Sequence, residues 1–344
     1  MTQNSFVLVA NAVAGSISTF RFTGSELQPV AVTDGLTGCS TFAVDAAHGL
    51  VYAGVKGADG GPAGIVTLTF NPGSGELTPR SRLDLPDGGI NYLALTRDGT
   101  GLLGASYGGG YGISCGIADG VVSEPVSRIE FPNLHSVLAS ADGRFAYFVS
   151  LGADLVAQYA LGDDLILQPL EPETVSAPAS SGPRHLVLNG AQDAVYVLTE
   201  FSGEVLHFAR DTSSGTLTLQ GAASAVDPTA GLGHSEFGAD PRANHFIWGA
   251  DLHWSRDDRL WASERTESTL GAVSVAADGA VFAPARFFKT EMQPRGFDVS
   301  PDGAFLVAAG EKSDAVALYA VDGDALTLLH RTQTAAGPNW VRFL

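Results

Sequence analysis

The chain has 344 residues, of which 45% are hydrophobic, so it can bury a sizeable core and is not globally disordered. Its formal net charge of −18 at pH 7 argues against nucleic acid or an anionic membrane as a partner. An anionic small substrate would therefore need a local basic pocket, set against the charge of the whole protein.

The sequence shows neither a recognisable secretory signal nor a membrane span. Residues 1–10, MTQNSFVLVA, have no basic stretch before the apolar residues and are typical of a strand. No apolar run reaches the roughly 18 residues of a membrane span. The two cysteines, Cys39 and Cys115, fall in different repeats. We therefore expect reduced thiols in a cytoplasmic protein.

Six β-hairpins recur along the chain, with scarcely any sustained helical periodicity. Each has two apolar runs around a turn and is followed by a second apolar pair. The residues that open the six turns are Asp45, Thr96, Ser140, Asn189, Ser255 and Ser300. Their spacings of 51, 44, 49, 66 and 45 residues are typical of a propeller blade of four antiparallel strands.

The two ends of the chain complete a seventh repeat. Residues 337–344, GPNWVRFL, begin a first strand and stop, whereas residues 5–10 and 16–22 supply strands that lack a preceding first strand. Pairing of the termini would remove the unpaired sheet edges of an open ring. We therefore predict an all-β fold, a seven-bladed β-propeller that forms a single domain over residues 1–344.

The 66-residue spacing indicates an insertion of about 15–20 residues relative to the roughly 45-residue blade period. It lies around Ala222 to Trp248. A long loop within a compact fold often forms a lid or binding loop, and a tolerated surface insertion is the alternative.

Polar residues recur at the start of the first strand of each hairpin. Five residues before the turn stand Ser40, Asn91, His135, Arg184, Ala250 and Arg295. The second strands close with Gly54, Ser106, Ser150, Glu200, Arg265 and Gly310. Because the first strands of the blades line the channel of a propeller, charged members of both sets should converge at one mouth. The predicted cluster is His135, Arg184, Glu200, Arg265 and Arg295.

This cluster suits an anionic ester or lactone. Arginine binds carboxylate or phosphate in a bidentate manner and can stabilise a developing oxyanion. His135 or Glu200 could activate a water molecule, and the sequence leaves open which of them is the base.

Three other patterns point to different chemistry. The string G-x-S-x-G around Ser114 matches serine hydrolases, but no helix pattern follows it, so we expect Ser114 on an outer strand. Asp251 and His253 face the same side of a strand and could form a metal pair, yet no further ligands are suitably spaced, and we expect no metal. His185 follows Arg184 and should point away from it, into the blade.

Long strings of the sequence resemble the lactonase family of seven-bladed propellers. The likeness is clear from about Asn133 onward and is carried by LHSVLASADGRFAYFVSLGADLVAQY, GPRHLVLNGAQDAVYVLTEFSGEV, ADLHWSRDDRLWASERT, TEMQPRGFDVSPDGAFLVAAGEKSDAVALY and GPNWV. The family includes bacterial propeller-type 6-phosphogluconolactonases, which the sequence resembles most, and the fungal carboxy-cis,cis-muconate cyclase. Residues 240–247 and Glu264 depart from the family pattern.

The resemblance implies particular roles for these residues. The catalytic His, Arg, Glu and Arg of the family match His135, Arg184, Glu200 and Arg265. Substrate binding is assigned to Arg295, Asp251 and Lys312, the last as a phosphate contact or, alternatively, a solvated loop lysine. The implied reaction is hydrolysis of 6-phospho-D-glucono-1,5-lactone, a step of the pentose phosphate pathway, without a cofactor.

Two alternatives remain open at this point. One is a cycloisomerase of the carboxymuconate type, and the other is a non-catalytic propeller that binds a protein. For the enzyme we expect a small anionic sugar lactone as the partner, no nucleic acid or membrane, and a monomer or weak homo-oligomer.

Overall fold

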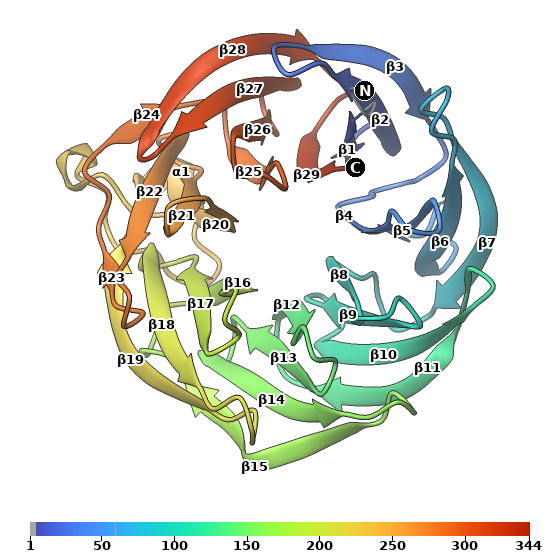
Figure 1. Cartoon of the computed structure of the whole chain (residues 1–344), viewed down its shortest axis with the longest axis horizontal. Helices are drawn as coiled ribbons and strands as arrows, with labels where there is room; N and C mark the ends of the chain where they lie inside the picture. Colours follow the sequence, from blue (N-terminus) through green and yellow to red (C-terminus); the bar gives the residue numbers. More distant parts are fainter. Residues whose placement is uncertain (1–4, 59) are drawn as a thin grey trace.

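Seven antiparallel sheets form a ring around a central channel in the computed structural model, which describes residues 5–58 and 60–344 (Figure 1). Blade one combines both chain ends: β29 (Pro338–Phe343), β1 (Ser5–Asn11), β2 (Ser16–Phe22) and β3 (Leu27–Thr33). Blades two and three are β4 (Thr41–Asp45), β5 (Leu50–Val55), β6 (Ala63–Phe70) and β7 (Leu77–Leu85), then β8 (Tyr92–Leu95), β9 (Gly101–Ser106), β10 (Tyr111–Ala118) and β11 (Val121–Glu130).

The remaining blades follow in chain order. Blades four and five are β12 (Leu134–Ala139), β13 (Phe145–Ser150), β14 (Leu155–Leu161) and β15 (Leu167–Ser176), then β16 (Pro183–Leu188), β17 (Ala194–Thr199), β18 (Glu204–Arg210) and β19 (Leu217–Ser224). Blades six and seven are β20 (Gly249–Ser255), β21 (Arg259–Glu264), β22 (Thr269–Val275), β23 (Val281–Phe282) and β24 (Phe287–Lys289), then β25 (Pro294–Val299), β26 (Phe305–Gly310), β27 (Ala315–Asp322) and β28 (Ala325–Gln333).

The predicted seven-bladed ring and its closure are confirmed. β1 pairs antiparallel with β29, with Val9 opposite Val341, so strands from the two chain ends share one sheet. Residues 1–4 of the stretch expected as a strand lie outside the described residues. In each blade the first strand in the order given lies nearest the channel, and we call these seven the inner strands (Figure 1).

The hydrophobic core lies between neighbouring blades. The second strands are buried on both faces, as in AVYVLT of β17, whereas the outermost β19 exposes most of its side chains. One cluster joins Phe145 of blade four to Val197 and Phe208 of blade five. Burying each such side chain contributes about 1.5–3 kcal/mol, so the packing between blades holds the inner strands in place.

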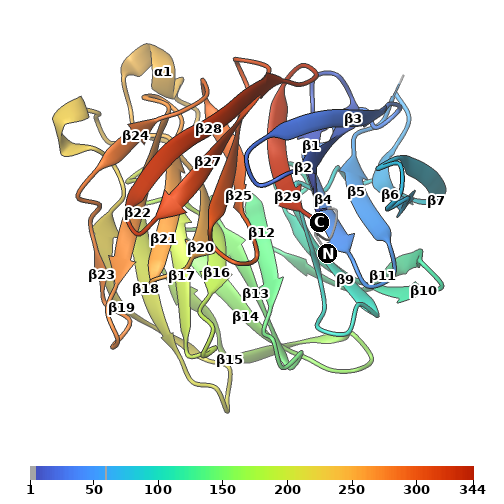
Figure 2. The ribbon, with the colours of Figure 1, turned by 45° about the horizontal axis from the view of Figure 1, so that its top comes forward.

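The insertion forms the connection between β19 and β20. It contains the short helices η1 (Pro228–Ala230) and α1 (Pro241–Asn244). Asp240 caps α1, since its Oδ1 accepts a hydrogen bond from the Ala243 N–H at 3.1 Å. α1 projects from one face of the ring on the side of blade six (Figure 2). Neither it nor any other helix in the described ranges is long and apolar enough to cross a membrane.

Candidate active site

A cavity of about 570 Å³ opens where the inner strands begin. Blades two to seven contribute to its walls, and all five residues predicted to converge are among its lining. The described residues that line it are Ser40, Lys56, Ala63, Gly89, Ile90, Asn91, Tyr107, Gly108, His135, Arg184, Glu200, Trp248, Arg265 and Arg295. A cavity of about 980 Å³ between blades five and six is larger, but its acidic lining, with Asp193, Asp258 and Asp278, does not suit an anion.

β-Bulges direct polar side chains of the inner strands into the cavity. The pairing of β12, β16 and β25 with the next strand skips one residue in each case, and the skipped residues are His135, Arg184 and Arg295. In β20 the skip covers Ala250 and Asp251. A bulge leaves the extra residue unpaired and re-aims its side chain. In these strands the position five residues before the turn is therefore the residue at the bulge.

The prediction that His185 points away from Arg184 is wrong. The Nε2 atom of His185 lies 3.1 Å from Arg184 Nη1, and its ring meets the His135 ring edge-on, with 5.2 Å between centroids. The bulge is the physical reason, because two residues of β16 oppose one residue of β17 and the alternation of an extended strand fails there.

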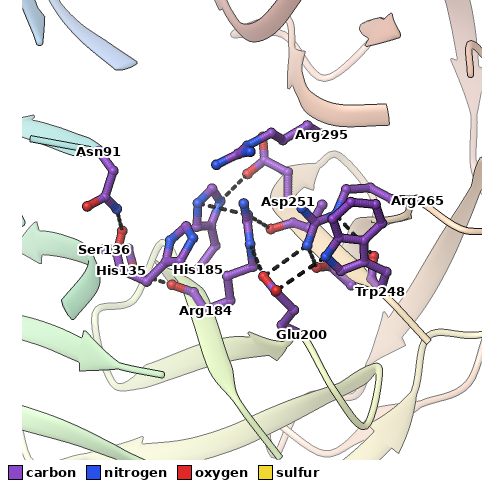
Figure 3. Close-up of polar contacts among 12 residues, drawn as sticks. Asn91, His135, Ser136, Arg184, His185, Glu200, Trp248, Asp251, Arg265 and Arg295 are labelled. Carbon is purple, nitrogen blue, oxygen red and sulfur yellow. Dashed lines mark hydrogen bonds and ion pairs between the residues drawn. The ribbon is translucent and has the colours of Figure 1, made fainter. Parts of the chain in front are cut away.

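Glu200 joins the two buried arginines of the cavity (Figure 3). Its Oε2 atom lies 2.8 Å from Arg184 Nε and 2.9 Å from Arg265 Nη2. Its Oε1 atom accepts a hydrogen bond from Trp248 Nε1 at 3.2 Å. Both carboxylate oxygens thus have partners, and such a fully bonded arrangement is what a buried ion pair needs to be tolerated.

The charges around Glu200 set its proton affinity. Burial acts to raise the pKa of Glu200, but the guanidinium groups of Arg265, Arg184 and Arg295 outweigh it and hold the pKa below its ordinary value. Burial lowers the pKa of Arg265 to about 9, and the Glu200 carboxylate opposes that shift. Glu200 is therefore an anion, and Arg265 a cation, at neutral pH.

His135 is the neutral basic group of the cavity. Burial, followed by the nearby positive charge of Arg184, lowers the pKa of its imidazole well below the ordinary value of 6.5. Within the described residues its ring makes no hydrogen bond, and its Nδ1 atom is buried. Asn91 Nδ2 donates to the His135 carbonyl at 2.7 Å and helps to fix this part of β12. The ring is therefore a base with a free lone pair.

Lys56 and Tyr107 also line the cavity, although the sequence analysis missed them. The backbone N–H of Lys56 donates to the Thr37 carbonyl at 2.8 Å. The backbone N–H of Glu200 donates to the Gly182 carbonyl at 2.6 Å in the same way. Lys56 and Glu200 therefore occupy the same position in their respective blades. The repeat comparison instead set Gly54, nine residues after the residue that opens its turn, beside Glu200, which lies eleven residues after its own. Counting a constant distance from the turn would have selected Lys56 and Tyr107.

Trp248 is the residue of the insertion that lines the cavity. Its ring lies under Arg265, whose Cζ atom is 3.9 Å from the ring centroid. Glu264 accepts a hydrogen bond from the Trp248 N–H at 2.9 Å. The insertion and Glu264 together hold an aromatic wall beside the arginine cluster.

Three other candidate residues lie elsewhere. Asp251 is buried and bonds His185, outside the cavity lining. Lys312 is an exposed residue between β26 and β27 and does not line the cavity either. Ser114 is buried on β10, where its hydroxyl donates to the Leu165 carbonyl at 2.6 Å, as expected for a strand residue. Among the described residues no group of three or more His, Cys, Asp or Glu side chains could hold a metal.

The buried imidazole of His185 predicts acid sensitivity. Burial and the charge of Arg184 lower its pKa from 6.5 to about 3, against the opposing charge of Asp251. Below pH 6.5 the unfolded chain binds a proton there that the folded chain does not, so stability falls as the pH drops from 6.5 towards 3. We expect His185→Gln to flatten the dependence of Tm on pH in this range. His48→Gln, in an exposed turn, is the control, and equal slopes in both variants would contradict the prediction.

Comparisons with known proteins agree with the fold. A family model described as "Lactonase, 7-bladed beta-propeller" matches residues 6–343. The chain is 32% identical over 281 residues to a 6-phosphogluconolactonase of Enterobacter sp., covering 80% of this chain and 81% of that protein. It is 32% identical over 286 residues to a 6-phosphogluconolactonase of Sodalis glossinidius, covering 82% of each.

A solved structure shows the same fold. The periplasmic gluconolactonase of Pseudomonas aeruginosa superimposes with a TM-score of 0.86 at 24% identity, covering 99% of each chain. Since the family model spans nearly the whole sequence and the relatives match most of their own length, the resemblance stated from the sequence is confirmed. The chain belongs to the lactonase family of seven-bladed β-propellers and is an enzyme of that lactone-hydrolysing class.

Proposed function

We propose that this enzyme hydrolyses a phosphorylated sugar-acid lactone, with 6-phospho-D-glucono-1,5-lactone as substrate and 6-phosphogluconate as product. The observation that carries the proposal is a local excess of positive charge. Lys56, Arg184, Arg265 and Arg295 line the cavity, and Glu200 is the single carboxylate among the described residues of its lining, in a protein whose net charge is −18. Such a local cluster of positive charge attracts and orients an anion.

Two of these cations are available to bind a phosphate. Arg184 and Arg265 already share the Glu200 carboxylate. Lys56 makes no side-chain hydrogen bond or ion pair with any described residue. Arg295 is one-third exposed and lies 3.7 Å from Glu311. The phosphate would therefore bind between Lys56 and Arg295, with the lactone ring directed towards the buried arginines.

In the proposed mechanism a water molecule attacks the lactone carbonyl carbon. His135 takes the proton of this water, and the carbonyl oxygen becomes an oxyanion beside Arg184. When the tetrahedral intermediate collapses, the bond from the carbonyl carbon to the ring oxygen breaks. The ring oxygen then receives the proton from His135, so His135 is regenerated as a neutral base.

His135 is favoured over Glu200 as the base for two reasons. Both oxygens of Glu200 are occupied by the arginines and Trp248, and its pKa is held low. His135 is neutral and has a nitrogen without a hydrogen bond in the described part of the chain. Glu200 would then orient the two guanidinium groups.

Proton release measured in EDTA tests the proposal. We expect opening of 6-phosphogluconolactone well above its spontaneous rate, with a higher kcat/KM than for glucono-1,5-lactone. No enzymatic rate on either lactone would overturn the proposal. A preference for the unphosphorylated lactone would overturn the phosphate assignment, and turnover of a carboxylated cis,cis-muconate in place of lactones would favour the cycloisomerase.

Lys56→Met is expected to raise KM for the phosphorylated lactone about tenfold, the loss of roughly one charge-assisted hydrogen bond. The KM for glucono-1,5-lactone should stay within about twofold. Lys289→Met removes an exposed lysine from a surface pair with Glu267 and is the matched control. An equal effect on both lactones would show that Lys56 does not contact the phosphate.

A further inference from the structure

We infer that Asp251 and His185 are positioning residues for the lactonase reaction, and that Asp251 acts through His185 to hold Arg184 in its working orientation. The inference rests on the proposed function, in which Arg184 faces the carbonyl oxygen. It gives Asp251 a role different from the substrate contact expected from the sequence, since Asp251 lies outside the cavity lining.

The contacts of His185 determine which ring nitrogen carries its proton. Nδ1 lies 2.6 Å from Asp251 Oδ1, and Nε2 lies 3.1 Å from Arg184 Nη1 (Figure 3). A guanidinium group can only donate, so Nε2 must be the acceptor. The proton is therefore on Nδ1 and is donated to the Asp251 carboxylate. Asp251 fixes the tautomer that gives Arg184 an acceptor.

Asp251 is itself held rigidly. Its Oδ1 atom also accepts from the Leu252 N–H at 3.0 Å, and its Oδ2 atom accepts from the Phe297 N–H at 3.2 Å. The side chain is 3% exposed and bridges β16, β20 and β25. Because both oxygens accept from donors, an amide at this position would place its NH₂ group against another donor. A carboxylate fits these contacts and an amide does not.

The held guanidinium has one nitrogen left for a ligand. Arg184 Nε donates to Glu200, and Nη1 donates to His185 and to the Ala250 carbonyl. These three contacts use three of the five N–H groups of the side chain. Nη2 makes no hydrogen bond to the residues that the structure describes, and Arg184 lines the cavity. His185 thus fixes the plane in which Nη2 is presented to the oxyanion.

The test compares Asp251→Asn with the wild type on the phosphorylated lactone. We expect kcat to fall by about 10–100-fold, because a misplaced oxyanion donor costs transition-state stabilisation, while KM changes less than about threefold. The matched control is Asp302→Asn, the same substitution at a hydrogen-bonded turn aspartate outside the cavity lining. An unchanged kcat in Asp251→Asn, or an equal loss in Asp302→Asn, would overturn the inference.

A second measurement needs neither activity nor a folded variant. Nitrogen-15 NMR of histidine-labelled wild type at neutral pH should show His185 neutral, with the proton on Nδ1 and a bare Nε2. A proton on Nε2 would overturn the inference whatever the substrate proves to be. If the wild type opens no lactone but His185 has the expected tautomer, the proposed function fails while the Asp251–His185–Arg184 coupling stands.

Discussion

Replacing His135 by glutamine is expected to lower kcat for lactone opening by about 10²–10⁴-fold, the usual contribution of a general base. Glutamine keeps a polar side chain of similar length at the bulge of β12 but cannot take the proton of the attacking water. KM should change little, because the substrate phosphate is bound on other residues. Initial rates of proton release at saturating substrate measure the effect.

The pH profile distinguishes a catalytic His135 from a structural one. Burial holds the pKa of His135 well below 6.5. The nearby groups of Arg184, His185, Arg295 and Arg265 lower it further. The base therefore stays deprotonated as the pH falls through 6.5, and kcat/KM should decline only at lower pH. His207→Gln, a buried histidine outside the cavity lining, is the control for stability. Retention of near-wild-type kcat in His135→Gln would exclude His135 as the base.

Replacing Glu200 by alanine is expected to lower the free energy of unfolding by about 3–5 kcal/mol, because it leaves two buried guanidinium groups without their counter-charge. Arg184 and Arg265 are 1% and 2% exposed, so water solvates neither guanidinium group while Glu200 is in place. Activity should fall as well, since Arg184 loses a contact that orients it. Urea unfolding followed by tryptophan fluorescence measures the stability change.

A surface pair provides the control for Glu200. Glu267 pairs with the exposed Lys289 at 2.7 Å, and Glu267→Ala should cost only about 0–1 kcal/mol. In the double variant Glu200→Ala/Arg265→Ala, removal of one unpaired cation should recover part of the lost stability. A Glu200→Ala cost as small as that of Glu267→Ala would show that the buried network does not stabilise the fold.

The bulges explain how far sequence reasoning could go at the site. His135, Arg184 and Arg295 stand at one repeat position because the same irregularity occurs in three inner strands, so a simple alignment found them. The orientation of His185 could not be found in this way, because an alternation argument assumes a regular strand. The repeats located the bulged residues. Only the register of the strand pairing showed in which direction the side chains next to them point.

The sequence by itself determined the all-β class, the seven-bladed ring and its closure. Regular turn spacing and the incomplete repeats at the two chain ends encode these features locally. The seven sheets confirm the ring, and the pairing of β1 with β29 confirms its closure. The same regularity placed Arg184 and Glu200 at one end of a hairpin, where they form an ion pair.

Only the tertiary structure decided which other residues meet in the cavity. Trp248 reaches Glu200 from the next blade, and Asp251 meets His185 across the same interface. Such pairs are separated by tens of residues, and their contact depends on how one blade packs on the next. Packing between blades minimises exposed apolar area without regard to sequence distance, so no local pattern records its result.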